Sequence, residues 1–489
     1  MINLFSALEL GKNSLLAHQK VFHIIGHNIS NVNTEGYSRQ VPIMQSVPPE
    51  ILNTDKVGRG VQLFTIKSIR DRFITNQIIE RKQYEGKYDT LTGVFSTVEA
   101  LFNESHELGL SDQLTDFFNK WSDLANNPTD IATRNALINS SVSLSNNIQN
   151  TYLRLIDQQE IANGNIETLV DEINSIANEI GELNEKIVYA TGAGQPASDL
   201  LDLRERKIRE LSERVGINFY YNQSNNSVTI EVAGKPLVSY NRVNELSVQR
   251  DATNSNYYDV YINQYDSTPT DITYDIEYGR LEALISMRDT YIPEYKQKLD
   301  NFAYGLITNV NNIHQNGFAL DTTTTGLNFF VPYTPTTPGD YSGAAGLIEV
   351  NSALINDPTL IAASGQVDPG PPPSGAVGNN EIALQIAELM DSDNVVDSDN
   401  DGTFDYGTFH EYLHSLMSEI GNDSYQAKYE LEANSSMVTY LENKRDEISG
   451  VSLDEESANL IQYEKSYQAV AQFFGLVNRL TDVLISLGR

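Results

Sequence analysis

The 489-residue chain contains no cysteine, and this absence excludes several classes of site at once. A chain without thiols has no disulfide framework, no thiol nucleophile and no cysteine-ligated zinc or iron–sulfur site. The chain also has no run of about 20 apolar residues, so the sequence predicts no membrane-spanning helix. Its first twenty residues lack the basic segment and compact apolar run of a secretory signal peptide, so we expect any export to follow another route.

Basic residues are scarce as well. The chain has 33 Lys and Arg against 66 Asp and Glu, which gives a formal net charge of −33. Nucleic-acid binding depends on cationic contacts to phosphates, so this charge makes nucleic acid a poor candidate partner. Hydrophobic residues make up 40% and charged residues 20% of the chain, which favours a folded protein over a disordered one. At about 150 residues per domain, the length suggests about three structural units.

Two helices with narrow apolar seams are predicted at the extreme ends of the chain. At each end the apolar residues are spaced alternately by three and four positions, which is typical of a helix that packs on another helix. Gly11 and His18 are weak positions in the first seam, and Thr481 interrupts the second. Such helices are marginal alone, so we expect them to pair partly with each other and to gain most of their order from an assembly. The predicted assembly seam consists of Leu4, Leu8, Leu15, Phe22, Ile25, Ile29, Leu460, Tyr463, Tyr467, Val470, Phe474 and Val477.

The predicted fold is mainly α, a long helical bundle with coiled-coil helices at the N- and C-termini. Further amphipathic helices are predicted over residues 166–187 and 292–313. An alternation of apolar and polar residues predicts a small inserted β domain, and a segment rich in Thr, Pro and Gly predicts a variable surface insertion. The expected domains are a terminal coiled-coil domain (1–50 and 446–489), a helical bundle (51–215, 279–316 and 380–445), the β domain (216–278) and the insertion (317–379).

The segment His410-Glu411-Tyr412-Leu413-His414 matches the H-E-x-x-H pattern of zinc hydrolases. On a helix its two imidazoles lie one turn apart and can ligate zinc, with Glu411 as the general base. The long form of this motif is not completed, because Met417 and Ile420 stand where it needs Gly and His. The apolar residues of the segment also form a core stripe that leaves the histidines on its flank. We therefore favour a packed framework helix and predict no catalytic residue, no metal ligand and no cofactor.

An acidic segment lies just upstream, Asp397-Ser-Asp399-Asn-Asp401-Gly402-Thr-Phe-Asp405. Carboxylates at positions 1, 3, 5 and 9 with Gly at position 6 resemble a calcium-binding loop, because Gly allows the tight turn that brings the oxygens together. The bidentate Glu expected at position 12 is replaced by Thr408. The segment is either a solvated acidic turn before a helix or a structural calcium site, and the sequence leaves both interpretations open.

Both ends of the chain resemble one known group of proteins. Asn28-Ile-Ser-Asn-Val-Asn-Thr-Glu-Gly-Tyr-Ser-Arg-Gln40 is similar to the N-terminal signature of bacterial flagellar axial proteins, a group of rod, hook and hook-associated proteins. Ser452-Leu-Asp-Glu-Glu-Ser-Ala-Asn-Leu-Ile-Gln-Tyr-Glu-Lys-Ser-Tyr-Gln-Ala469 resembles their C-terminal signature. Within this group, the Gly-Tyr-Ser-Arg-Gln form resembles the hook-associated protein 1 family. Interior positions that share the resemblance include Gly60-Val61, Ile69-Arg70-Asp71, Trp121, Asn127-Pro128, Arg134, Leu200-Leu-Asp-Leu-Arg204, Asn311, His314 and Gly317.

The resemblance implies a non-enzymatic structural protein at the junction of hook and filament, located outside the cell after export from the cytoplasm. It implies that the chain is exported unfolded and that its terminal helices become ordered on assembly. The implied partners are copies of the chain in a ring, the hook protein, a second junction protein of the hook-associated protein 3 type, and an export chaperone with the flagellar export apparatus. No nucleic acid and no membrane insertion are expected. The alternatives are a hook or rod protein and, in a different class, a secreted metallopeptidase that uses His410, Glu411 and His414.

Overall fold

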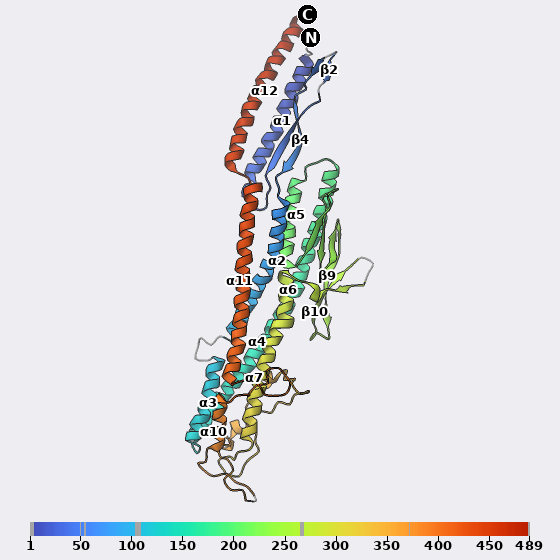
Figure 1. Cartoon of the computed structure of the whole chain (residues 1–489). Helices are drawn as coiled ribbons and strands as arrows, with labels where there is room; N and C mark the ends of the chain where they lie inside the picture. Colours follow the sequence, from blue (N-terminus) through green and yellow to red (C-terminus); the bar gives the residue numbers. More distant parts are fainter. Residues whose placement is uncertain are drawn as a thin grey trace. The chain divides into compact units, whose positions relative to one another are not determined.

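Figure 1 shows the computed structural model of the chain, in which residues 4–48, 50–52, 55–102, 109–264, 268–370 and 372–487 are described. The chain forms two compact units, each built from segments that are far apart in the sequence. Unit 1 comprises Met1–Lys87, Leu169–Leu281 and Glu432–Arg489, and unit 2 comprises Tyr88–Thr168 and Glu282–Leu431. Three long helices contribute to both units, namely α2 (Arg72–Leu101), α4 (Ile131–Gly192) and α11 (Phe409–Ser449).

The two ends of the chain pair with each other in unit 1. α1 (Leu4–Ser30) and α12 (Leu453–Leu487) lie side by side and run antiparallel, so both termini lie at the same end of the pair (Figure 1). α1 also packs against the antiparallel strands β1 (Gln40–Ser46) and β4 (Val61–Ser68), which frame the short hairpin of β2 (Glu50–Leu52) and β3 (Asp55–Val57). α1 is therefore held from two sides, whereas α12 packs mainly on α1.

The rest of unit 1 contains the helix α5 (Ser198–Arg214) and two small antiparallel sheets. The side chain of Asn184, from α4, anchors the first sheet through hydrogen bonds to the backbone of Val228 and Tyr240. Because Val228, Ile230 and Val232 alternate with polar residues, one face of this sheet is buried. The strands are β5 (Asn218–Tyr221), β6 (Val228–Val232), β7 (Lys235–Ser239) and β8 (Arg242–Val243) in the first sheet, and β9 (Glu245–Asp251), β10 (Tyr257–Asn263) and β11 (Thr270–Asp271) in the second.

Unit 2 is built around an aromatic core. Trp121, Phe117 and Phe118 project from α3, and Phe409 opens α11; all four side chains are buried, and Phe118 stacks on Phe409. A short π-helical segment, Met287–Tyr291, joins α6 (Gly279–Ser286), whose first three residues belong to unit 1, to α7 (Ile292–His314). The other helices of this unit are α3 (Leu110–Asn126), α8 (Ala344–Leu347), α9 (Ser352–Asn356) and α10 (Glu381–Glu388).

The insertion that follows α7 is held tightly to the helices. It supplies Phe329 and Phe330 to the aromatic core. The Asn311 side chain accepts hydrogen bonds from the backbone N–H groups of both phenylalanines, at 2.8 and 2.9 Å. Arg134, from α4, donates to the carbonyl oxygens of Pro128 and Ile361, both at 2.7 Å. Asn311 and Arg134 belong to the stretches that share the family resemblance, and their structural role is to fix irregular backbone onto helices.

The predicted fold class is confirmed: the protein is mainly helical, with long helices at both ends and a small inserted sheet region. Among the described residues, none of the helices combines the length and the apolar character that crossing a bilayer requires.

Candidate functional site

The predicted seams of α1 and α12 lie against each other within the chain. The Phe474 ring fits against Gly11 so closely that a Cβ atom built on Gly11 would lie 2.8 Å from the ring. The rings of Phe22 and Tyr467 meet edge to face, with centroids 5.8 Å apart. His18 packs beside Tyr463, and burial lowers the pKa of this imidazole, which favours its neutral form. The two positions that weaken the heptad in the sequence therefore both accommodate aromatic rings of α12.

The seam is only partly buried. Of the predicted seam residues, Ile25 and Val477 are buried, and Leu460 is exposed. Among the described side chains of α12, Glu456 and Val477 alone are buried. A helix that hides so little of its apolar surface depends on further contacts for stable order.

A second row of apolar side chains on α12 faces solvent. Phe473, Leu476, Leu480 and Val483 are each 40–54% exposed, and we call these four residues the outer row. Their spacing of three, four and three positions is again that of a helix–helix contact. The sequence analysis missed this row because it followed one heptad register through α12. A search for a second register, offset by one residue, would have found it.

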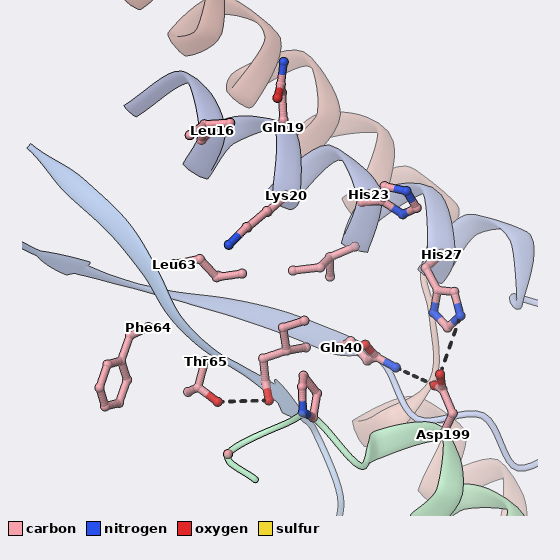
Figure 2. Close-up of a pocket in the computed structure, with 14 residues that line it drawn as sticks. Leu16, Gln19, Lys20, His23, His27, Gln40, Leu63, Phe64, Thr65 and Asp199 are labelled. Carbon is pink, nitrogen blue, oxygen red and sulfur yellow. Dashed lines mark hydrogen bonds and ion pairs between the residues drawn. The ribbon is translucent and has the colours of Figure 1, made fainter. Parts of the chain in front are cut away.

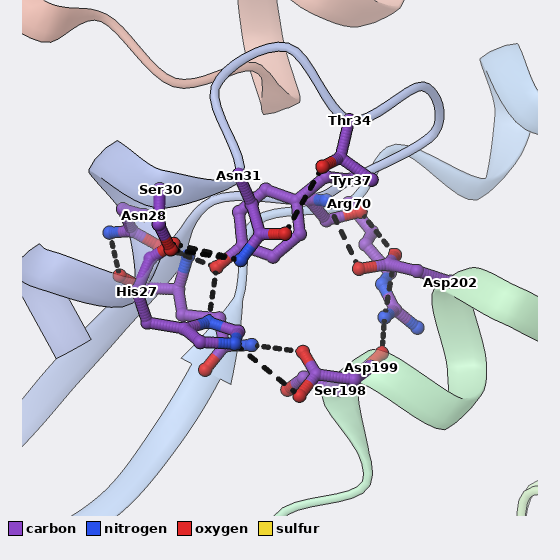
Figure 3. Close-up of polar contacts among 12 residues, drawn as sticks. His27, Asn28, Ser30, Asn31, Thr34, Tyr37, Arg70, Ser198, Asp199 and Asp202 are labelled. Atoms are coloured by element: carbon purple, nitrogen blue, oxygen red, sulfur yellow. Dashed lines mark hydrogen bonds and ion pairs between the residues drawn. The ribbon is translucent and has the colours of Figure 1, made fainter. Parts of the chain in front are cut away.

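The N-terminal signature folds into a turn that is organised by Asn28, which is 1% exposed (Figure 3). The Asn28 amide nitrogen donates to the Gln40 carbonyl oxygen at 2.9 Å and to Glu456 Oε2 at 3.2 Å. Its amide oxygen accepts hydrogen bonds from the Tyr37 hydroxyl at 2.9 Å and from the Gln40 N–H at 3.0 Å. Since an amide side chain offers two donors and an oxygen with two lone pairs, Asn28 uses its full capacity.

The C-terminal signature joins the same network. Arg39 Nε donates to Glu456 Oε1 at 2.7 Å, and Arg39 Nη1 donates to Glu455 Oε2 at 2.6 Å. The Arg39 N–H donates to the Ser449 carbonyl oxygen at 2.8 Å. Glu456 is almost fully buried, so its carboxylate needs both Arg39 and Asn28 as partners.

Helix α5 closes the network through Asp202 (Figure 3). The Asp202 carboxylate accepts hydrogen bonds from the Ser38 hydroxyl at 2.6 Å and pairs with Arg70 at 2.8 Å. Burial raises the pKa of Asp202, whereas Arg70 and Ser38 act in the opposite direction. We call Asn28, Tyr37, Arg39, Asp202 and Glu456 the polar anchor. It unites the N-terminal signature, the C-terminal signature and the interior stretch 200–204.

A groove of about 750 Å³ opens beside the polar anchor, lined by α1, β4 and residues around the start of α5 (Figure 2). Its lining includes the exposed apolar side chains Leu16 and Phe64 together with Lys20 and His23. A mixed apolar and polar lining of this kind suits contact with another protein.

The H-E-x-x-H segment begins α11 in unit 2, and its residues have structural partners. The Thr408 N–H donates to Glu411 Oε2 at 2.9 Å, and the Glu411 N–H donates to Thr408 Oγ1 at 3.2 Å. This reciprocal pair is a capping box, which satisfies two backbone N–H groups at the start of the helix. His410 lies 3.3 Å from the hydroxyls of Ser111 and Thr115, and its ring centroid is 6.4 Å from that of the exposed His414. Glu411 therefore caps the helix.

Comparisons with known proteins agree across the whole chain. The family model for the helical domain of flagellar hook-associated protein FlgK matches residues 95–330, and the model for the C-terminal region of flagellar basal body rod FlgEFG proteins matches residues 442–487. Flagellar hook-associated protein 1 of Bacillus subtilis is 25% identical over 516 residues, which covers 99% of each chain. The protein of the same name from Escherichia coli is 27% identical over 550 residues, covering 99% of this chain and 100% of the relative. The solved structure of the flagellar hook junction protein FlgK from Burkholderia pseudomallei superposes with a TM-score of 0.64 at 14% identity, covering 76% of this chain and 100% of that chain.

Proposed function

The chain belongs to the flagellar hook-associated protein 1 family, and from this premise we propose that it is a non-enzymatic structural component of the junction between hook and filament. The observation that carries the proposal is the outer row of α12, a heptad-spaced apolar surface that stays about half exposed in the single chain. Such a surface is what a subunit needs in order to pack on its neighbours in an axial structure.

In this proposal the two apolar rows have different tasks. The seam from Leu4 to Val477 holds α1 and α12 together, and the outer row contacts a helix of the next copy of the chain in a ring. Fully burying an exposed Leu, Val or Phe side chain contributes about 1.5–3 kcal/mol, so completing the burial of these four half-exposed side chains contributes about 3–6 kcal/mol to association. The same burial orders α12, because the helix gains in the assembly the contacts that it lacks in one chain.

The polar anchor supports these separate roles of the seam and the outer row. It ties the end of α1 and the start of α12 to α5 through hydrogen bonds and ion pairs centred on the buried Asn28, Asp202 and Glu456, so the terminal pair projects from a defined base. Buried networks of this kind specify one arrangement when every member is satisfied. We infer that the anchor sets the angle at which the terminal pair enters the assembly.

The finer partners follow from the family. We propose that the hook protein and a second junction protein of the hook-associated protein 3 type contact the chain at the two ends of its ring. We also propose that an export chaperone and the flagellar export apparatus deliver it outside the cell. A chain without cysteine supports this route, since it unfolds and refolds without any thiol chemistry.

A deletion strain complemented with variants tests the proposal. Without the chain, electron microscopy should show bare hooks, and flagellin monomers should accumulate in the medium. Replacing Leu476 and Leu480 by Asp should reproduce this phenotype although the purified variant stays folded. Asn478→Asp, which adds a charge at an exposed polar position of the same two turns, is the matched control and should support filaments. Normal filaments in the deletion strain would show that the chain does not form the junction, and filaments on the double variant would remove the outer row from the assembly surface.

A further inference from the structure

We propose that the loop from Asp397 to Asp405 in unit 2 binds one calcium ion through the carboxylates of Asp397, Asp399 and Asp405. One oxygen from each of these carboxylates lies within 4.8 Å of the other two. Carboxylate oxygens that converge in this way, without nitrogen or sulfur donors, form the ligand set that hard divalent cations prefer.

The backbone holds the loop closed. The N–H groups of Asp405 and Tyr406 both donate to the Val396 carbonyl oxygen, each at 3.0 Å. Between these ends, Asn400 with φ of 64° and Gly402 with φ of 90° turn the chain back on itself. Asp405 is thereby returned to the side of Asp397.

Asp397 gives a second and independent indication of a cation site. Its side chain is fully buried, and its Oδ2 atom accepts hydrogen bonds from the Tyr341 hydroxyl and from the Gly402 N–H. Its Oδ1 atom is also buried, yet no hydrogen-bond partner for it occurs among the described residues. Nor does Asp397 take part in any ion pair within the described ranges. A buried carboxylate oxygen without a partner is costly, and buried charges are normally paired or bound to a metal.

The surrounding sequence offers no side-chain cation to fill this place. Residues 299–427 contain 17 Asp and Glu but not one Lys or Arg. Lys298, at the edge of this stretch, is already engaged by Glu294 and Glu419. The basic residues nearest in the sequence, Lys298 and Lys428, therefore flank this stretch, and an ion from solvent would supply the positive charge that it lacks.

The structure also revises which carboxylates belong to the site. The sequence pattern counts Asp401 as a ligand, but Asp401 lies outside the cluster, and its Oδ1 atom accepts the N–H of Thr403 at 2.7 Å. Position 12 of the pattern is Thr408, which caps α11. With three carboxylates and no bidentate Glu, the expected dissociation constant is on the order of 10⁻⁴–10⁻³ M, the range of weak extracellular calcium modules.

Calorimetric titration of the purified full chain with calcium chloride tests the proposal. We expect one saturable ion per chain. Asp399→Asn and Asp405→Asn should each weaken binding by at least about tenfold, because each removes a charged ligand and keeps an amide oxygen as hydrogen-bond acceptor. Asp401→Asn is the matched control: it removes the same charge from the same loop and should weaken binding by less than about threefold.

Thermal unfolding provides a second readout. At a free calcium concentration ten times the dissociation constant, mass action favours the folded state by a factor of about eleven, so the wild-type and Asp401→Asn chains should melt at a higher temperature. Asp399→Asn and Asp405→Asn should lose this calcium-dependent shift. Binding that does not saturate, or an equal loss in all three variants, would overturn the proposal, because it would mean diffuse attraction of cations to an acidic surface.

Discussion

Helices α7 and α12 carry the same kind of apolar repeat and reach very different degrees of burial. In α7, 13 of 23 residues are buried, including His314 at its last position. In α12, Glu456 and Val477 are the buried residues among the side chains that the structure describes. A three-and-four spacing therefore identifies a helix that needs a partner, but not whether that partner lies in the same chain. The difference also separates two kinds of energetic role, since α7 stabilises its own unit whereas α12 leaves apolar surface exposed, and we propose that this surface serves association.

The largest effect on the free energy of unfolding is expected from a substitution that leaves a cavity in the core around α7. Phe302 is fully buried and meets Phe409 edge to face, with ring centroids 5.8 Å apart. Phe302→Ala leaves a cavity in this core and should lower the free energy of unfolding by about 3–5 kcal/mol. Urea unfolding followed by circular dichroism measures the change. A loss below about 1 kcal/mol would mean that α7 is no more tightly integrated than α12.

The buried end of α7 should also make the protein sensitive to acid. His314 Nδ1 lies 2.7 Å from the Leu327 carbonyl oxygen, and His314 Nε2 accepts the N–H of Ala362 at 2.9 Å, a pattern that requires neutral imidazole. Burial lowers the pKa of His314 from 6.5 to about 4. Below pH 6.5 the imidazole is protonated in the unfolded chain, whereas in the folded chain it stays neutral until about pH 4. The free energy of unfolding therefore falls as the pH falls from 6.5 to 4.

At pH 5 this single group should remove about 2 kcal/mol from the free energy of unfolding relative to pH 7. The imidazole resonances in NMR spectra report its titration directly, and His414→Gln, at an exposed position, should leave the His314 titration unchanged. A His314 midpoint near 6.5 would rule out this contribution.

A smaller effect should distinguish the seam from the rest of α1. Gly11→Ala places a methyl group 2.8 Å from the Phe474 ring and should destabilise the terminal pair by about 1–2 kcal/mol, because the ring has to move. Gly26→Ala in the same helix is the control, since nothing lies within 4 Å of the added methyl group there. Alanine should stabilise that position by up to about 1 kcal/mol. Hydrogen exchange of α12 amides should accelerate in the first variant only; equal exchange in both would show that Phe474 does not hold the pair.

The smallest effect on the isolated chain is expected at the outer row. Leu480→Ala removes a half-exposed side chain and should change the free energy of unfolding by less than about 0.5 kcal/mol. The same substitution should weaken incorporation into the flagellum, measured as the fraction of cells with filaments. If Leu480→Ala costs as much stability as Phe302→Ala, α12 is integrated like α7 and the comparison between the two helices fails.

Local spacing predicted much of this molecule, and long-range contacts account for the rest. The heptads located the terminal helices, and the alternation of apolar and polar residues located the inserted sheets, because both patterns depend on neighbours in the sequence. The polar anchor joins Asn28 to Glu456, which are 428 positions apart, and no periodicity reports such a pair. The irregular segment after α7 reads as a variable surface insertion, although Phe329 and Phe330 lie in the core, since its Thr, Pro and Gly content hides two isolated aromatics.

The candidate sites show the same difference between what local sequence predicts and what depends on long-range contacts. Side-chain types located the acidic loop, but only the fold shows that Asp405 lies in the cluster and that Asp401 does not. Likewise, the H-E-x-x-H spacing is satisfied by the sequence, whereas the capping box between Thr408 and Glu411 depends on where α11 begins. Gly11 and His18 interrupt the apolar heptad in the sequence. Only the structure shows that they make room for the Phe474 and Tyr463 rings of α12.

The contact of Arg39 with Glu455 and Glu456 has a consequence for how this family can change over generations. It joins codons from opposite ends of one reading frame, so a substitution that removes the charge at Arg39 or at Glu456 leaves the other residue without its partner. Exchange of one terminus for a sequence that lacks the matching charge should therefore impair function, whereas exchange of residues 28–40 together with 452–469 should preserve it. The coding segments for the two ends of the chain should therefore be inherited together.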